Sequence, residues 1–316
     1  MKNIDLHFHT TVSDGKYTNE QVIAEAKNKG LDFICVTEHD IVNTQLAILA
    51  RENGIESIEG VEISIFDKKI AQKSLHITCY ADRFSGDIIK VLENNRNGKI
   101  NKIQKQITVL KNNGFQIDYN EFLEYNKNKG FDIQNLNNSH ISEYIYLNEY
   151  NVKLIKELTG ENLKWGDFIR RCLKTTGDLR HIGWVHVDDY EPSMNKVGEI
   201  SKESGYFLSL AHPNFTFKND FELFILFIQE YKDILNGIEI NSLASKEWVE
   251  VILRTAKKYN MILTFGSDDH FERELVDEVH GKLGDTNPHI SDSDIMENFR
   301  SFLLLVNTVK SIKKSS

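Results

Sequence analysis

Short apolar runs in this chain read as strands, and each ends at or near a histidine or a carboxylate. They lie at residues 4–6, 31–36, 55–65, 75–80, 206–210, 237–240 and 261–265. Apolar residues with helical spacing follow several of them, at 18–29, 41–53, 193–204, 221–231, 246–259 and 290–312. Alternating strands and helices predict parallel βαβ units, whose strands end at a common edge where polar side chains can converge.

The first strand end carries two histidines. Side chains alternate along a strand, so Asp5, His7 and His9 point to one side, and Asp14 lies on the loop just beyond. Two such imidazoles with a nearby carboxylate predict a metal site that needs further ligands. A lone histidine at a strand end is usually an ordinary buried or loop residue, but the repetition argues against that here. Later strand ends repeat the pattern at His39, Glu62, His76, His212, Asp268 and His270.

The length allows either two domains or one large α/β barrel with an insertion. Residues 85–180 form a separate stretch, helical in pattern and rich in Asn and Lys, with helices expected at 88–110, 121–126, 141–158 and 165–173. We therefore predict a β/α domain over 1–84 and 181–316. Residues 85–180 would be a helical insertion that contributes to the active-site cleft.

Composition restricts the partners and the compartment. The net charge of −9, from 38 basic and 47 acidic residues, argues against binding duplex DNA through the overall field. Three scattered cysteines give neither a zinc ribbon nor a disulfide framework. The first strand begins too early for a signal peptide, and no apolar run is long enough to span a membrane. We expect a cytoplasmic protein.

An ordered set of motifs now points to a family. They are Asp5-Leu6-His7-Phe8-His9-Thr10 with Ser13-Asp14-Gly15, Thr37-Glu38-His39-Asp40, Gly60-Val61-Glu62-Ile63-Ser64, Leu75-His76, Ala211-His212-Pro213 and Gly266-Ser267-Asp268-Asp269-His270. Over roughly residues 1–84 and 205–275, the chain resembles the PHP (polymerase and histidinol phosphatase) phosphoesterases. The resemblance implies a distorted seven-stranded (β/α)7 barrel that holds two or three divalent metals.

The resemblance also implies which residues bind them. The first metal would be held by His7, His9, Glu62 and Asp268. Glu62 would bridge to a second, which His76 also binds, and a third would be held by Asp14, His39 and His270. Mixed imidazole and carboxylate ligands suit manganese, iron or zinc. Asp5 is expected to support the ligands rather than bind metal.

The remaining candidates concern the second metal and the substrate. Asn138-Ser139-His140 resembles the Arg-Pro-His segment of nucleotide-type members, so His140 would complete the second metal. The usual arginine is Asn138 here. Its phosphate contact would then be missing or supplied elsewhere, and the available replacements are Arg170, Arg171 and Arg180. His212 would contact phosphate or protonate the leaving oxygen, and these alternatives stay open.

The predicted activity is metal-dependent phosphoester hydrolysis. Divalent ions lower the pKa of bound water from about 16 to about 7 and can stabilise both oxygens of an in-line displacement. The nucleotide-type resemblance implies a nucleoside monophosphate, a 3′,5′-bisphosphate nucleotide or the 5′ end of a short single-stranded RNA. The alternatives are a histidinol phosphate phosphatase and a non-catalytic metal-stabilised module. Glu239 is left as supporting or structural, and His181, His186, His280 and His289 as structural.

Overall fold

The computed structural model describes residues 3–187, 190–271 and 280–313. The chain divides into two compact units, which are described separately. The first comprises Met1–Glu93 with Glu191–Ser316, and the second comprises Asn94–Tyr190. The contribution of the helical stretch to an active-site cleft stays a prediction.

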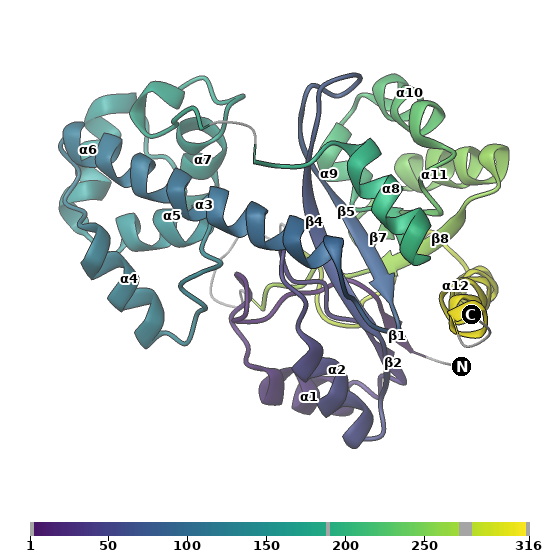
Figure 1. Ribbon diagram of the computed structural model, residues 1–316. Helices are drawn as coiled ribbons and strands as arrows, with labels where there is room; N and C mark the ends of the chain where they lie inside the picture. Colours follow the sequence, from purple (N-terminus) through teal and green to yellow (C-terminus); the bar gives the residue numbers. More distant parts are fainter. Residues whose placement is uncertain (1–2, 188–189, 272–279, 314–316) are drawn as a thin grey trace. The chain divides into compact units, whose positions relative to one another are not determined.

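Figure 1 shows the strands and helices in chain order. The strands are β1 (Ile4–Asp5), β2 (Phe33–Ile34), β3 (Glu56–Ser57), β4 (Glu59–Asp67), β5 (Lys73–Ala81), β6 (Phe207–Leu210), β7 (Gly237–Asn241) and β8 (Ile262–Gly266). The helices of the first unit are α1 (Asn19–Asn28), α2 (Thr44–Glu52), α8 (Met194–Ser204), α9 (Pro213–Phe217), α10 (Phe221–Tyr231), α11 (Lys246–Tyr259) and α12 (Asp292–Lys313). Helix α3 (Asp87–Asn112) begins in the first unit and continues into the second.

The first unit contains two sheets. Strands β1, β2 and β3 pair in parallel, as the βαβ pattern predicts. Strands β6, β7 and β8 also pair in parallel, within a five-stranded sheet of order β4-β5-β6-β7-β8. Backbone hydrogen bonds join the two sheets at the polar ends of their strands, from Leu6 N–H to the Phe265 carbonyl (3.0 Å) and from Glu62 N–H to the Glu38 carbonyl (3.0 Å).

Two strand pairings depart from the all-parallel expectation. Strands β4 and β5 form an antiparallel hairpin, and β5 pairs antiparallel with β6. The reason lies in the connection, because only residues 68–72 separate β4 from β5. A parallel crossover needs about a dozen residues or more, whereas a hairpin turn needs only a few. The described strands thus give an α/β fold with two sheets, and they do not form the closed seven-stranded barrel that we expected.

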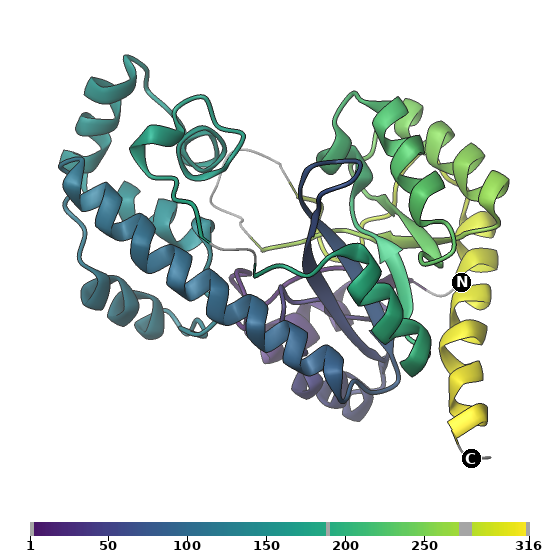
Figure 2. The ribbon, with the colours of Figure 1, turned by 45° about the horizontal axis from the view of Figure 1, so that its top comes forward.

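Helices cover both sheets with apolar faces. Helices α1 and α2 pack together beside the short sheet (Figure 1). Val22, Ala26 and Leu46 of these helices are buried. Helices α10 and α11 lie side by side next to the long sheet, and α12 lies along β8 (Figure 2). Burying one such aliphatic side chain contributes about 1.5–3 kcal/mol. Packing on the outside of the sheets leaves the polar strand ends free for chemistry.

The second unit is helical, with its own apolar core around Phe122, Phe168 and Leu173. Its elements are α4 (Tyr119–Asn128), α5 (Asn138–Tyr146), α6 (Glu149–Thr159), α7 (Trp165–Phe168), a π-helix (Ile169–Leu173) and a 3-10 helix (Arg180–Ile182). The helix that we expected over 141–158 is two helices, because Asn148 caps the start of α6 by accepting a hydrogen bond from Tyr150 N–H. Among the helices that the structure describes, none has the length and apolarity needed to cross a bilayer.

Candidate metal centre

The polar ends of the strands bring six imidazoles and three carboxylates of the first unit into one cluster. Its members follow β1, β2 and β8 or lie on or next to β4, β5 and β6, and all are at least two-thirds buried at the side chain. They are His7, His9, Asp14, His39, Glu62, His76, His212, Asp268 and His270. These are the predicted site residues of this unit, apart from Asp5.

Two imidazole nitrogens and two carboxylate oxygens form the first group. Nε2 of His9 lies 3.3 Å from Nε2 of His7, from Oε2 of Glu62 and from Oδ1 of Asp268. Nε2 of His7 lies 3.5 Å from the same two carboxylate oxygens. A tetrahedron whose corners lie about 2.0–2.1 Å from its centre has edges of about 3.3–3.4 Å. These five separations are close to those between ligands of one first-row metal.

Hydrogen bonding explains why a cation fits there. Nδ1 of His7 donates to Oε2 of Glu239 over 2.6 Å, which leaves a lone pair on Nε2. That lone pair faces the carboxylate oxygens, and Oε2 of Glu62 is buried yet accepts no hydrogen bond from the described residues. Converging lone pairs in a buried site are costly unless a positive ion lies among them. The residues present thus fit a divalent metal.

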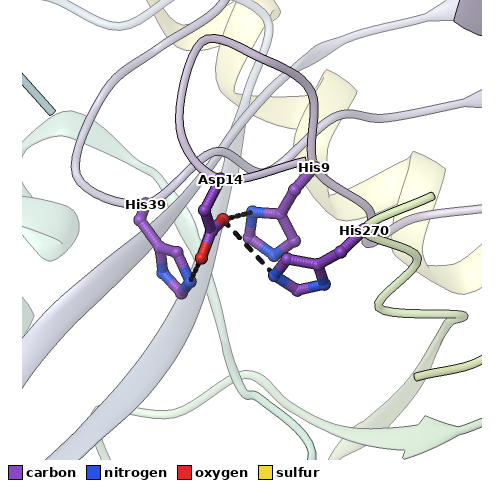
Figure 3. Close-up of side chains that lie close together, drawn as sticks. All are labelled: His9, Asp14, His39 and His270. Atoms are coloured by element: carbon purple, nitrogen blue, oxygen red, sulfur yellow. Dashed lines mark ion pairs between the residues drawn. The ribbon is translucent and has the colours of Figure 1, made fainter. Parts of the chain in front are cut away.

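Asp14 is the centre of a second group. Figure 3 shows its carboxylate among three imidazoles, with Oδ1 3.3 Å from Nε2 of His270 and Oδ2 3.6 Å from Nε2 of His39. Nδ1 of His9 lies farther off, at 3.8 Å from Oδ1. Nδ1 of His270 donates to the Asp268 carbonyl over 2.9 Å, so its Nε2 also presents a lone pair. The structure thus brings together the three residues predicted for a third metal.

Glu62 links the groups through its two oxygens. Oε1 lies 2.8 Å from Nε2 of His212 and 3.0 Å from Nδ1 of His76. Oε2 lies 2.9 Å from Nδ1 of His39, in addition to its contacts with His7 and His9. A carboxylate with each oxygen facing a different set of imidazoles has the geometry of a bridging ligand.

The charge state of the carboxylates agrees with this arrangement. Burial by itself raises the pKa of Glu62, but the imidazoles of His76, His39 and His7 outweigh it and hold that pKa well below its usual range. Burial likewise opposes ionisation of Asp14 and Asp268, yet neighbouring histidines hold both pKa values well below the usual range. Anionic carboxylates are the form that binds metals, and a metal that binds beside them displaces any proton on the ligand nitrogen of a neighbouring imidazole.

Comparison with known proteins now gives the family. The family model described as "PHP domain" matches residues 5–305. The chain belongs to the PHP domain family. The match spans both stretches of the first unit and the helical unit between them.

Curated relatives of this PHP chain match over short stretches. A phosphoribosyl 1,2-cyclic phosphate 1,2-diphosphodiesterase from Eggerthella lenta is 36% identical over 75 residues, 23% of this chain and 28% of the relative. A 3′,5′-nucleoside bisphosphate phosphatase from Chromobacterium violaceum is 39% identical over 67 residues, 21% of this chain and 24% of the relative. A 5′-3′ exoribonuclease from Haemophilus influenzae is 38% identical over 65 residues, which are 20% of this chain and 24% of the relative. The matched stretch spans about a quarter of each relative.

Solved structures share the fold along nearly the whole chain. A protein from Bifidobacterium adolescentis, proposed to be a metal-dependent phosphoesterase, superposes with a TM-score of 0.68 at 19% identity, covering 95% of this chain and 96% of the other. A Chromobacterium violaceum protein described as an amidohydrolase, with bound sulfate, gives a TM-score of 0.67 at 19% identity, covering 86% and 89%. At this identity the likeness concerns the fold alone.

In this PHP chain Glu239 contacts the ring of His7, whereas Asp5 contacts the backbone. The Asp5 carboxylate accepts hydrogen bonds from the backbone N–H of His7 (3.1 Å) and of Gly284 (2.7 Å) and from the Ser267 hydroxyl (2.6 Å). It therefore stabilises the backbone beneath the cluster. Burial raises the pKa of the Asp5 carboxyl to about 7. The sequence predicts Glu239 near the end of a strand, and the structure places it within β7. Only the fold shows that its carboxylate meets the ring of His7.

Glu38 organises the loop that carries Asp14. Its carboxylate accepts hydrogen bonds from the Thr10 hydroxyl, the Ser13 hydroxyl and the Asn43 side chain (3.1 Å). Ser13 Oγ in turn lies 3.3 Å from Nδ1 of His9. This buried network fixes the spacing between His9 and Asp14.

Four predicted residues belong to the helical unit, and their parts in the site stay predictions. His140 lies in the first turn of α5, where its Nδ1 accepts a hydrogen bond from Asn137 N–H over 3.0 Å. Arg171 is paired with Glu161 (2.8 Å) and Asp178 (2.7 Å), and Arg170 with Asp167. Arg180 donates to the Thr175 carbonyl over 3.1 Å.

Proposed function

We propose that the chain is a metal-dependent phosphoesterase whose centre binds two or three divalent ions, with manganese, iron or zinc as candidates. The convergence of His7 and His9 with carboxylate oxygens of Glu62 and Asp268, at 3.3–3.5 Å, carries the proposal. When bound, such ions supply an activated water and neutralise phosphate charge. We also interpret the two sheets as halves of the distorted family barrel, because backbone hydrogen bonds join their polar ends.

In this proposal the residues of the site have different roles. The imidazoles and carboxylates of the cluster other than His212 hold the ions, Glu239 orients His7, and Glu38 holds the loop of Asp14. His212 borders the cluster, with Nε2 2.8 Å from Oε1 of Glu62 and a side-chain exposure of 11%, close to the 13% of His39. We assign it to the substrate, either as proton donor to the leaving oxygen or as a phosphate contact.

Two measurements on His212→Gln separate these roles. A proton donor matters most for a poor leaving group, so kcat for a nucleoside monophosphate would fall far more than kcat for p-nitrophenyl phosphate. A phosphate contact would raise KM for both substrates alike. Unchanged kcat and KM for both substrates would remove His212 from the mechanism.

We propose a nucleotide as substrate: a nucleoside monophosphate, a 3′,5′-bisphosphate, or the 5′ end of a short single-stranded RNA. The names of the three curated relatives support this, since they refer to a phosphoribosyl cyclic phosphate, to a nucleoside bisphosphate and to a ribonuclease. A panel of these compounds with histidinol phosphate tests it. Turnover of histidinol phosphate alone would overturn the nucleotide assignment.

The activity itself is tested by His9→Ala and Asp268→Ala. Either variant should abolish phosphate release while circular dichroism and the urea midpoint show a folded chain. His289→Ala is the matched control, because His289 is an exposed histidine of the same unit. Full activity in either site variant would refute the assignment, and metal binding without any turnover would favour a non-catalytic module.

A further inference from the structure

A histidine outside the predicted cluster touches one of its carboxylates. Nδ1 of His280 lies 3.1 Å from Oδ2 of Asp268. The ring of His280 packs against the ring of His270, with centroids 4.1 Å apart and an angle of 39° between the two planes. The side chain is 28% exposed, so it lies at the border of the cluster rather than beneath it. No motif in the sequence pointed to this residue.

The residues after His280 hold it in place. Gly281 N–H donates to the Ser267 carbonyl over 2.9 Å, Leu283 N–H to Oδ2 of Asp269 over 2.6 Å, and Gly284 N–H to Oδ2 of Asp5 over 2.7 Å. Leu283 is fully buried. Residue 281 must be glycine, because a Cβ there would collide with Oγ of Ser242 and the Ser267 carbonyl. The contact with Asp268 thus comes from a segment anchored on the end of β8.

The two oxygens of Asp268 have different partners. Oδ1 faces Nε2 of His7 (3.5 Å) and of His9 (3.3 Å), whereas Oδ2 faces His280. A carboxylate can rotate about its Cβ–Cγ bond and exchange its oxygens, and a hydrogen bond to one oxygen opposes that rotation. The backbone of Asp268 is also held in a left-handed conformation, with φ of 57°.

We propose that His280 is a positioning residue for the first metal group. Its Nδ1–H holds Oδ2 of Asp268, so that Oδ1 stays directed at the point shared with His7 and His9. The inference rests on the proposed function only in taking this group to bind a divalent metal. Partners of this kind are worth 10–100-fold in metal affinity in other metalloproteins.

The metal affinity of the purified 316-residue chain tests the proposal. Competition between the protein and a chromophoric chelator for Mn²⁺ or Zn²⁺ should show binding weakened about 10–100-fold in His280→Ala. His280→Asn should recover most of the loss, since its amide N–H can reach nearly the position of Nδ1–H. His289→Ala should bind like wild type. The number of ions bound at saturation should stay the same in every variant.

Activity adds a second readout that a purely structural role would not give. The kcat of His280→Ala should be low at limiting metal and return towards wild type when metal saturates. Urea unfolding without metal checks that the variant remains folded.

The outcomes that would contradict this inference can be told apart from those that would contradict the proposed function. Wild-type affinity in His280→Ala would overturn the inference and leave the proposed function intact. Loss of one whole ion, without rescue by Asn, would also overturn it, because His280 would then be a ligand itself. A wild-type chain that binds no metal would overturn the inference together with the proposed function.

Discussion

His7 donates its Nδ1 proton to Oε2 of Glu239 over 2.6 Å, and this bond decides which nitrogen of His7 faces the cluster. Both side chains are fully buried. Burial by itself lowers the pKa of His7, but Glu239 and the other carboxylates outweigh it and raise that pKa well above its usual value. A carboxylate behind a ligand imidazole increases its basicity and fixes its tautomer.

Glu239→Gln should weaken the metal affinity of the first group about 10–100-fold, because the amide retains an acceptor but not the charge. Isothermal titration calorimetry, with Mn²⁺ or Zn²⁺ added to the metal-free variant, measures this affinity. Glu247→Gln, the same change at an exposed carboxylate on α11, serves as control. Equal affinity in Glu239→Gln and the control would show that Glu239 is only structural.

Gly266→Ala should displace His7. A Cβ at Gly266 would overlap the Cβ of His7, so β1 and β8 could not approach as they do. We expect a loss of about 1–3 kcal/mol in the free energy of unfolding, typical of overpacking, together with weaker metal binding. Urea unfolding checks the first effect. Gly166→Ala is the control variant, since a Cβ added at Gly166 would have no atom within 4 Å that it could strike. A stable Gly266→Ala with full metal affinity would contradict the close approach.

His140→Ala separates a metal ligand from a helix cap. If His140 completes the second metal, elemental analysis should show about one ion fewer per chain. Loss of the cap contact with Asn137 should also cost about 1 kcal/mol of stability. Asn137→Ala should show the stability loss without the loss of metal. A full metal complement in His140→Ala would leave His140 with the capping role alone.

The pH dependence of metal-free protein should report on His39. Burial lowers the pKa of His39 to about 4, against the attraction of Glu62 and Asp14. Between about pH 4 and 6.5 the unfolded chain binds a proton there that the folded chain does not, so stability falls as the pH is lowered.

Urea unfolding at pH 4.5 to 7.5 therefore compares wild type with His39→Gln. The stability difference should increase with pH by up to about 3 kcal/mol and level off above pH 6.5. A difference independent of pH would show that His39 titrates normally in the folded chain.

Removing metal should lower thermal stability, since ions that bind only the folded chain stabilise it by mass action. At 1,000 times the dissociation constant this amounts to about 4 kcal/mol. A thermal scan after treatment with a chelator, and again after adding Mn²⁺ or Zn²⁺, measures the shift. His9→Ala should show a smaller shift on adding metal. Equal shifts in the two proteins would indicate binding outside the cluster.

The sequence by itself identified the cluster members. His7, His9 and Asp14 stand out because residue type and strand parity are local properties, and the ordered motifs supplied the family. The same local evidence misread β4 and β5 as parallel, although the few residues between them allow only a hairpin.

Tertiary structure alone decided which atoms meet. Glu239 and His7 are 232 residues apart, and His280 reaches Asp268 only because the backbone after Gly281 is anchored to the end of β8 and to Asp5. Hydrogen bonds between distant segments depend on how the strands pack, which no spacing in the sequence records. The residue types and motifs therefore identified the candidate ligands. Tertiary packing decided how the side chain of each one is oriented.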